Sequence, residues 1–227
     1  MAYSHTLAAA AAATALSFGL PVPAFATVVA QWNMDNTFGT TMTDSSGNGN
    51  DGTAYNIVTS GVGYIFDGSS SRAVVPTSAS LNPGTSNFSY TVQVQVDITP
   101  SPGTDYDLLR KGTGISTGGE YKVEIVNSNG LAKPKCVVQD SAGHTVSEQG
   151  KYSVADGKLH TITCVRTSSS LTLLLDSRTP QVTNAPLDGS INTKAPLTIG
   201  DKQGSINGAG DDWYNGSMRS ASVSVGP

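Results

Sequence analysis

Charged residues are scarce in this chain, which has 13 Lys or Arg and 17 Asp or Glu among 227 residues and a formal net charge of −4. A nucleic-acid-binding surface needs a basic patch or stripe that neutralises phosphates. The small number of basic residues therefore excludes nucleic acid as a partner. The abundance of Ser, Thr, Gly and Asn is instead typical of an extracellular β protein.

Long apolar runs are absent after residue 26, so no later segment could cross a membrane as a helix. Residues 1–26 read as a secretory signal peptide, because the apolar core Leu7–Leu20 is too short to span a bilayer and Ala24-Phe25-Ala26 matches a small-x-small cleavage site. An alanine-rich cytoplasmic helix is the alternative, since Met1–Thr6 contains no Lys or Arg. We expect a secreted protein whose mature part, residues 27–227, is one domain.

Cysteine is nearly absent, with only Cys136 and Cys164, and both lie in the expected mature part. In an oxidising compartment these two residues should form one disulfide, and two free buried thiols are the alternative. Because each lies on the inward face of an expected strand, we expect the bridge to join neighbouring strands. No further Cys or His has a spacing that suits a zinc site.

Helical periodicity is absent after residue 26, and apolar residues alternate with polar ones instead. Tyr90–Ile98 alternates strictly, which is typical of a strand with one buried face. Further short strands, separated by Gly, Pro and Asn turn signals, are expected at Ile65–Phe66, Ala73–Val75, Tyr121–Ile125, Cys136–Gln139, His160–Arg166, Leu171–Leu175, Leu197–Ile199 and Met218–Val225. Many short strands in one domain predict an all-β fold, a two-sheet antiparallel β-sandwich of the jelly-roll type.

Short motifs follow one another in a distinctive order along the chain. They are WNMD at 32–35, the polar loop 44–52, YIFDG at 64–68, AVVP at 73–76, FSYTV at 88–92, DGKLHTI at 156–162, LTIG at 197–200 and YNGSM at 214–218. This series resembles the laminin-G-like jelly rolls of the concanavalin A-like lectin/glucanase superfamily. The resemblance implies a curved two-sheet sandwich and, in many extracellular members, carbohydrate or protein binding. Some members cleave glycans, so the fold alone does not decide the function.

The loop Asp44–Gly52 consists only of glycine and small oxygen-bearing residues, so it can turn tightly or bind a hard cation such as calcium. It is not a self-contained EF-hand loop, because Tyr55 stands where the bidentate Glu is required. A site assembled from distant segments would use Asp35, Asp44, Asn48 and Asn50. Arg219 stands where the resembled domains commonly carry an acidic residue, so a hydrogen-bonded turn without metal is the alternative.

A glycan-cleaving enzyme normally needs two carboxylates about 5–5.5 Å apart for retention or about 6.5–9.5 Å apart for inversion. Glu120 and Glu124 would share a strand face at a separation of about 13 Å, with Lys122 between them. The Glu-x-Asp-x-x-Glu motif of the glucanase branch is absent, as are the lyase motifs Arg-Glu-x-Arg and Gln-x-His. Because a cross-strand pair of Asp residues is left open, a hydrolase or lyase stays an alternative.

A carbohydrate-binding surface is the leading interpretation. Sugars are held by an aromatic ring beneath their C–H face and by carboxylate, amide or Arg hydrogen bonds to their hydroxyls. The candidate contacts are Tyr106, Arg110, Lys122, Asp212, Trp213 and Tyr214. The sequence therefore predicts a secreted, non-catalytic jelly roll that binds polysaccharide or glycoconjugate. A structural or adhesive domain without a sugar site is a further alternative, because ordinary surface or core packing explains any one of these residues.

Overall fold

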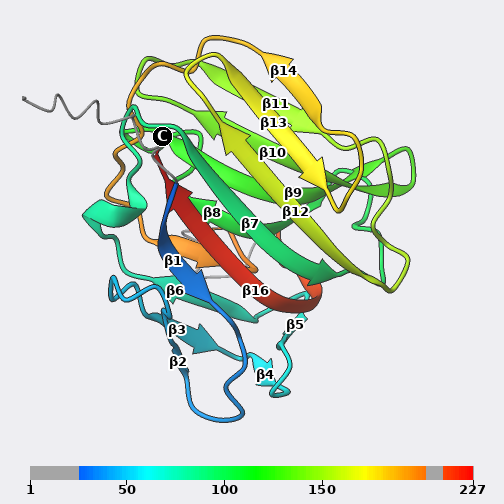
Figure 1. Cartoon of the computed structure of the whole chain (residues 1–227). Helices are drawn as coiled ribbons and strands as arrows, with labels where there is room; N and C mark the ends of the chain where they lie inside the picture. Colours follow the sequence, from blue (N-terminus) through cyan, green and yellow to red (C-terminus); the bar gives the residue numbers. More distant parts are fainter. Residues whose placement is uncertain (1–25, 203–211, 227) are drawn as a thin grey trace, which may run out of the picture.

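The computed structural model describes residues 26–202 and 212–226, which form two packed antiparallel sheets (Figure 1). The first sheet has the order β14-β13-β12-β7-β16-β5-β4, and β1 also pairs with β16. Its strands are β1 Thr27–Trp32, β4 Val58–Thr59, β5 Tyr64–Asp67, β7 Phe88–Gln95, β12 Leu159–Arg166, β13 Ser170–Leu175, β14 Gln181–Asn184 and β16 Asn215–Val225. The predicted signal peptide lies outside the described residues, apart from Ala26.

The second sheet has the order β11-β10-β9-β8-β15-β6-β3-β2. Its strands are β2 Thr41–Met42, β3 Gly52–Tyr55, β6 Arg72–Val75, β8 Asp105–Lys111, β9 Glu120–Ser128, β10 Leu131–Gln139, β11 Thr145–Gln149 and β15 Leu197–Ile199. One short 3-10 turn, Ala79–Leu81, is the only helical element in the described part of the chain. The predicted β-sandwich is confirmed, and no helix in the described residues is long and apolar enough to cross a membrane.

Alternation of apolar and polar side chains builds the sandwich, as the sequence predicts. In β7 every second residue, from Phe88 to Val94, is buried, and the residues between them are partly exposed. The alternation stops before Ile98, which lies outside the strand and is 57% exposed. A period of two places one face of each strand in the core, and this face supplies the hydrophobic stabilisation.

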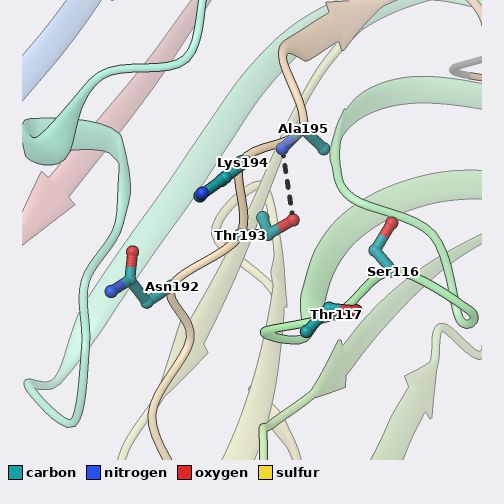
Figure 2. Close-up of a pocket in the computed structure, with 6 residues that line it drawn as sticks. All are labelled: Ser116, Thr117, Asn192, Thr193, Lys194 and Ala195. Atoms are coloured by element: carbon teal, nitrogen blue, oxygen red, sulfur yellow. Dashed lines mark hydrogen bonds between the residues drawn. The ribbon is translucent and has the colours of Figure 1, made fainter.

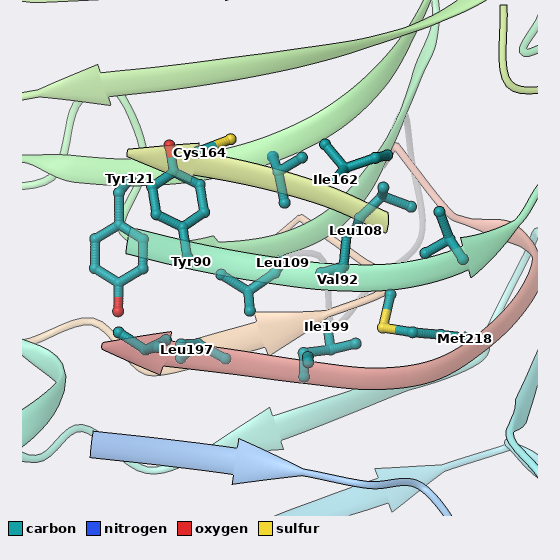
Figure 3. Close-up of a cluster of buried hydrophobic side chains, with 14 of the residues drawn as sticks. Tyr90, Val92, Leu108, Leu109, Tyr121, Ile162, Cys164, Leu197, Ile199 and Met218 are labelled. Atoms are coloured by element: carbon teal, nitrogen blue, oxygen red, sulfur yellow. The ribbon is translucent and has the colours of Figure 1, made fainter. Parts of the chain in front are cut away.

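The core is formed where the inner faces of the two sheets meet (Figure 3). Val92 and Ile162 from the first sheet and Leu109 and Ile199 from the second are all fully buried there. Tyr121 is buried as well, and its hydroxyl donates a hydrogen bond to the carbonyl oxygen of Leu81 at 3.1 Å. Its polar atom is therefore satisfied inside the core, which burial of a tyrosine requires.

The predicted disulfide between Cys136 and Cys164 is present, but it joins the two sheets instead of neighbouring strands. Cys136 lies on β10 of the second sheet, and Cys164 lies on β12 of the first. Both residues are fully buried. The sequence shows that both side chains point inward but does not assign their strands to sheets. The bridge therefore ties the two layers of the core together.

Several loops gather at one end of the sandwich, on the right in Figure 1. Because β7 and β12 are antiparallel, the end of β7 lies beside the start of β12, and a bridge between Val96 and Ala155 extends this contact. The end of β13 also lies near the start of β12, since Leu175 pairs with Ile162. The loops β7–β8, β11–β12 and β13–β14 therefore share this end.

Candidate functional site

A pocket with a volume of about 280 Å³ lies at this end and brings together three of the predicted ligand contacts, Tyr106, Asp212 and Trp213. We call it the acidic pocket. Its lining residues are Gly68, Ser101, Thr104, Asp105, Tyr106, Asp212, Trp213 and Asn215. They come from the turn after β5, the β7–β8 loop, the start of β8 and the segment that leads into β16. Asp211, which precedes this segment, lies outside the described residues.

The ring of Tyr106 packs against the ring of a second tyrosine, Tyr214. The rings of Tyr106 and Tyr214 meet edge to face with their centres 5.9 Å apart, and Tyr214 also packs against Phe66 at 5.3 Å. Tyr214 is fully buried, and its hydroxyl lies 2.8 Å from the carbonyl oxygens of Gln95 and Ser217. The prediction of Tyr214 as a ligand contact is therefore corrected, because its ring supports Tyr106 and offers no face to a ligand.

Trp213 is partly exposed and lies beside a cation. The guanidinium carbon of Arg72 lies 5.8 Å from the Trp213 ring centre and 5.0 Å from that of Tyr55. Arg72 is also 3.9 Å from a carboxylate oxygen of Asp201. These contacts orient the indole by cation–π attraction while the ring stays part of the pocket wall.

Gly68 allows the pocket to form at the end of β5. Its φ is +73°, a conformation that favours glycine. A Cβ at this position would lie 2.9 Å from the Cβ of Asn215, which lines the same pocket. A side chain here would therefore both strain the turn and push Asn215 away.

Three carboxylates converge at the acidic pocket. Oxygen atoms of Asp105, Asp107 and Asp212 all lie within 4.8 Å of one another. The backbone N–H of Asp107 donates to the carbonyl oxygen of Asp212 at 2.8 Å, which fixes the Asp212 segment against β8. Lys202 donates to the Asp212 carboxylate at 2.9 Å. Asp212 is thus held beside β8 by hydrogen bonds through both its backbone and its side chain.

The environment of Asp105 and Asp107 disfavours their charged forms. Burial raises the pKa of Asp105 to about 7, and the nearby carboxylates of Glu124 and Asp107 act in the same direction. Burial also raises the pKa of Asp107 to about 6, although Lys122 and Arg110 partly oppose this. At neutral pH Asp105 therefore holds a proton for much of the time and can both donate and accept a hydrogen bond.

Arg110 and Lys122 lie behind the acidic pocket and compensate its charge. Arg110 is only 3% exposed and contacts the carboxylates of Asp107 at 2.6 Å and Glu120 at 3.4 Å. Lys122 pairs with Glu124 and lies 3.7 Å from Asp107. Neither residue is among those that line the acidic pocket, and their role as direct ligand contacts stays a prediction. Buried ion pairs of this kind fix the positions of the acids.

The polar residues of β7 and β9 lie on different sheets. Gln93 and Gln95 belong to β7 of the first sheet. Glu120, Lys122 and Glu124 belong to β9 of the second sheet, and both glutamates are almost fully buried. They therefore do not form one surface.

The Asp44 carboxylate organises the glycine-rich loop through hydrogen bonds. Its oxygens accept bonds from the backbone N–H groups of Gln31, Ser46 and Asn50 and from the Ser46 hydroxyl, each at 2.9 Å. Although burial opposes it, these bonds hold the pKa of Asp44 below its ordinary value. N–H groups that point at a carboxylate occupy the lone pairs that a cation would need.

The remaining residues of the predicted calcium set differ in their surroundings. Asp35 and Asn48 are exposed, while Asn50 is buried and its side-chain oxygen accepts a bond from the Ser78 hydroxyl at 2.5 Å. These contacts support the alternative of a hydrogen-bonded turn. Calcium binding at this loop stays a prediction.

Asp105 was missed as a candidate by sequence reasoning. The signal that could have identified it is the spacing in Asp105-Tyr106-Asp107, because residues two apart share a strand face. Ser101, Thr104 and Gly68 carry no comparable signal, since such residues occur in most turns.

A larger pocket, about 430 Å³, lies between the β8–β9 loop and the segment before β15 (Figure 2). It is lined by Ser116, Thr117, Asn192, Thr193, Lys194 and Ala195. The backbone N–H of Asn192 donates to the carbonyl oxygen of Gly118 at 2.8 Å, which joins the two segments. Because no aromatic ring belongs to this lining, the pocket lacks a platform for a sugar ring.

A comparison with protein families gives one match, over about half of the chain. A family model for the Laminin G domain matches residues 115–224, which include β9–β15 and most of β16. The chain carries a laminin-G-like jelly roll. A search of curated proteins found no match.

The laminin-G-like jelly roll is also similar to domains of bacterial toxins. The binding domain of Paraclostridial Mosquitocidal Protein 1 aligns over 88% of this chain and 48% of its own, with a TM-score of 0.66 and 14% identity. A structure of botulinum neurotoxin type C, a toxin described as interacting with two ganglioside molecules, aligns over 87% and 47%, with a TM-score of 0.65 and 10% identity. The binding domain of botulinum neurotoxin DC in complex with SialylT aligns over 87% and 47%, with a TM-score of 0.63 and 10% identity.

The chain spans about half the length of these solved structures. Identities this low establish a common fold, and function has to be argued from the site.

Proposed function

We propose that this jelly roll is a secreted, non-catalytic module that binds a polysaccharide or glycoconjugate at the acidic pocket. The observation that carries the proposal is the convergence of Tyr106, Trp213 and the carboxylates of Asp105 and Asp212 on one pocket of about 280 Å³. Aromatic rings can contact the apolar C–H face of a sugar, and carboxylates accept hydrogen bonds from its hydroxyls.

The contacts that hold Tyr106 and Asp212 in place support this proposal. Tyr106 is held by Tyr214, and Asp212 by Lys202 and by the backbone N–H of Asp107. A preorganised site loses little conformational entropy when it binds a ligand. Secretion is supported by the signal-like segment 1–26 and by the buried disulfide, which is the kind of bond found in oxidising compartments. The ganglioside and SialylT contacts of the similar toxin domains are compatible with a glycan ligand.

A glycan array and insoluble-polysaccharide pull-downs on residues 27–227 test the proposal. We expect one glycan class to bind, and we expect Trp213→Ala and Asp212→Asn each to weaken it by about tenfold, equivalent to about 1.4 kcal/mol. Phe38→Ala is the matched control, because Phe38 is an aromatic residue that is 85% exposed and does not line the pocket. Absence of binding across the array, or binding that survives both pocket substitutions, contradicts the proposal.

The carboxylate cluster favours glycan hydrolysis as a second candidate function. The oxygens of Asp105, Asp107 and Asp212 lie within 4.8 Å of one another, and retaining enzymes place their two carboxyl groups about 5–5.5 Å apart. Asp105, with its pKa of about 7, would be the general acid. We rank this function second because both possible partners of Asp105 are already paired: Asp107 is fully buried against Arg110, and the Asp212 carboxylate accepts a hydrogen bond from Lys202 at 2.9 Å.

Release of reducing ends from a panel of polysaccharides separates the two functions. A binding module releases none. Hydrolysis that Asp105→Asn abolishes would replace the first proposal with the second.

A further inference from the structure

A different pocket, also about 280 Å³, lies at the same end of the sandwich and has the opposite charge. We call it the basic pocket, and its lining residues are Lys151, Tyr152, Thr179, Pro180 and Gln181. It is formed by the segment after β11 and the β13–β14 turn. The Thr183 hydroxyl of β14 donates to the Glu148 carboxylate of β11 at 2.6 Å and holds these two segments together.

Lys151 lines the basic pocket, and Arg178 lies beside it, over the ring of Tyr152. Lys151 and Arg178 are exposed, and neither forms an ion pair with an acid among residues 26–202 and 212–226. The Arg178 guanidinium lies 4.2 Å from the centre of the Tyr152 ring. This cation–π contact restrains the guanidinium but leaves its N–H groups able to donate to an anion.

Uncharged side chains of the basic pocket can contact the neutral part of a ligand. Tyr152 is 48% exposed, so its ring remains accessible in addition to its contact with Arg178. The side-chain oxygen of Gln181 is buried and accepts no hydrogen bond from the described residues. Because that oxygen is shielded from solvent, the exposed Thr179 hydroxyl, which lines the pocket, is the neutral contact available to a ligand hydroxyl.

We infer that the basic pocket binds an acidic sugar residue, whose carboxylate or sulfate group is held by Lys151 and Arg178. This inference rests on the proposed glycan-binding function and adds a preference for anionic glycans. The sugar ring contacts Tyr152, and its hydroxyls reach Thr179. The volume is close to the lower limit of small-molecule pockets, about 300 Å³, and suits a single sugar residue.

The two pockets differ in what they can accept. The basic pocket attracts an anionic group through Lys151 and Arg178, whereas the described residues that line the acidic pocket include two carboxyl groups and no cation. A glycan in contact with this end of the domain would place its acidic residue at Arg178 and a neutral residue at Trp213. Charge therefore orients the ligand.

Isothermal titration calorimetry on residues 27–227 tests the inference with three probes: an oligogalacturonate, a sulfated galactan oligosaccharide and a neutral galactan oligosaccharide. We expect at least one acidic probe to bind, more weakly at high salt. The double variant Lys151→Ala, Arg178→Ala should weaken it by at least about tenfold and leave any neutral-probe binding unchanged. Comparison of the two acidic probes identifies the group as carboxylate or sulfate.

Lys158→Ala is the matched control at the same end, because its side chain is 78% exposed and lies 3.8 Å from Asp156. All substituted side chains are exposed, so circular dichroism should show an unchanged fold. The inference is overturned if neither acidic probe binds, if the double variant binds as tightly as the wild type, or if Lys158→Ala has the same effect.

Trp213→Ala separates a failure of this inference from a failure of the proposed function. If the double variant loses acidic-probe binding and Trp213→Ala does not, the acidic pocket is refuted as a glycan site and the basic pocket is retained as one. If the neutral probe binds only when Trp213 is present, and the acidic probes bind no more tightly than the neutral one, the inference about the basic pocket is refuted and the proposed function stands.

Discussion

Substitution of Asp105 by Asn should stabilise the fold, and the gain should depend on pH. Asp105 is partly buried beside Asp107 and Glu124, and these surroundings raise its pKa from 3.8 to about 7. Its Oδ1 atom is buried without a hydrogen-bond partner among the described residues. The carboxylate is therefore a cost to the folded state that an isosteric neutral amide would remove.

The pH dependence of this gain follows from the number of protons that the folded and unfolded states bind. Below about pH 4 the carboxyl is protonated in both states, so its charge does not affect stability. Between about pH 4 and 7 the unfolded chain loses this proton first, which favours unfolding, and above about pH 7 the cost is complete. A shift of about 3 units corresponds to at most about 4 kcal/mol at 1.36 kcal/mol per unit. Because Asp105 is partly exposed, screening by solvent reduces the expected gain to about 1–2 kcal/mol.

Urea unfolding between pH 4 and 8 measures this difference directly. Asp35→Asn, which changes an exposed aspartate, is the control and should change stability by less than about 0.5 kcal/mol. The reasoning is refuted if Asp105→Asn is no more stable than the wild type at pH 8, or if the gain is equally large at pH 4.

Three further substitutions test separate parts of the fold. Partial burial lowers the pKa of His160, but hydrogen bonds to Asp176 and Asp156 outweigh it and raise this pKa overall. The protonated His160 therefore stabilises the protein below its ordinary pKa of 6.5, and this contribution disappears as pH rises through the higher pKa of the folded state. The free energy of unfolding of His160→Asn, measured across pH 5–9, should lack this pH dependence. Replacement of both Cys136 and Cys164, 28 positions apart, by Ala should cost about 3–4 kcal/mol, and a loss below about 1 kcal/mol in urea would contradict the cross-sheet role of the bridge. Asp44→Ala should cost about 2 kcal/mol with or without calcium, and calcium-dependent stabilisation that this variant abolishes would establish a metal site instead.

The fold could be predicted from sequence where strands have one buried and one exposed face. Phe88–Gln95 shows this alternation and was identified, with an error only at its ends. Asp105–Lys111 was missed as a strand because its sequence, DYDLLRK, has no such alternation. A bulge between Asp107 and Leu109 shifts the register, and the charged side chains of Asp107 and Arg110 are buried as an ion pair. A single sequence does not reveal either cause.

The candidate site could be predicted only in part for a related reason. Tyr106, Asp212 and Trp213 were identified by residue type, and the structure brings them together because the backbone of Asp212 bonds to Asp107 across 105 positions of sequence. Tyr214 is adjacent to Trp213 but points into the core, and exposure of neighbouring aromatic residues cannot be distinguished without the strand register.

Tryptophan fluorescence during titration with a glycan identified on the array tests the central claim most directly. The chain has two tryptophans, of which Trp32 is fully buried and Trp213 lines the acidic pocket. We predict a saturable change in emission whose midpoint matches the calorimetric affinity and which disappears in Trp213→Ala. A glycan that binds without changing the emission, or that binds Trp213→Ala as tightly as the wild type, would contradict the assignment of the acidic pocket as the glycan site.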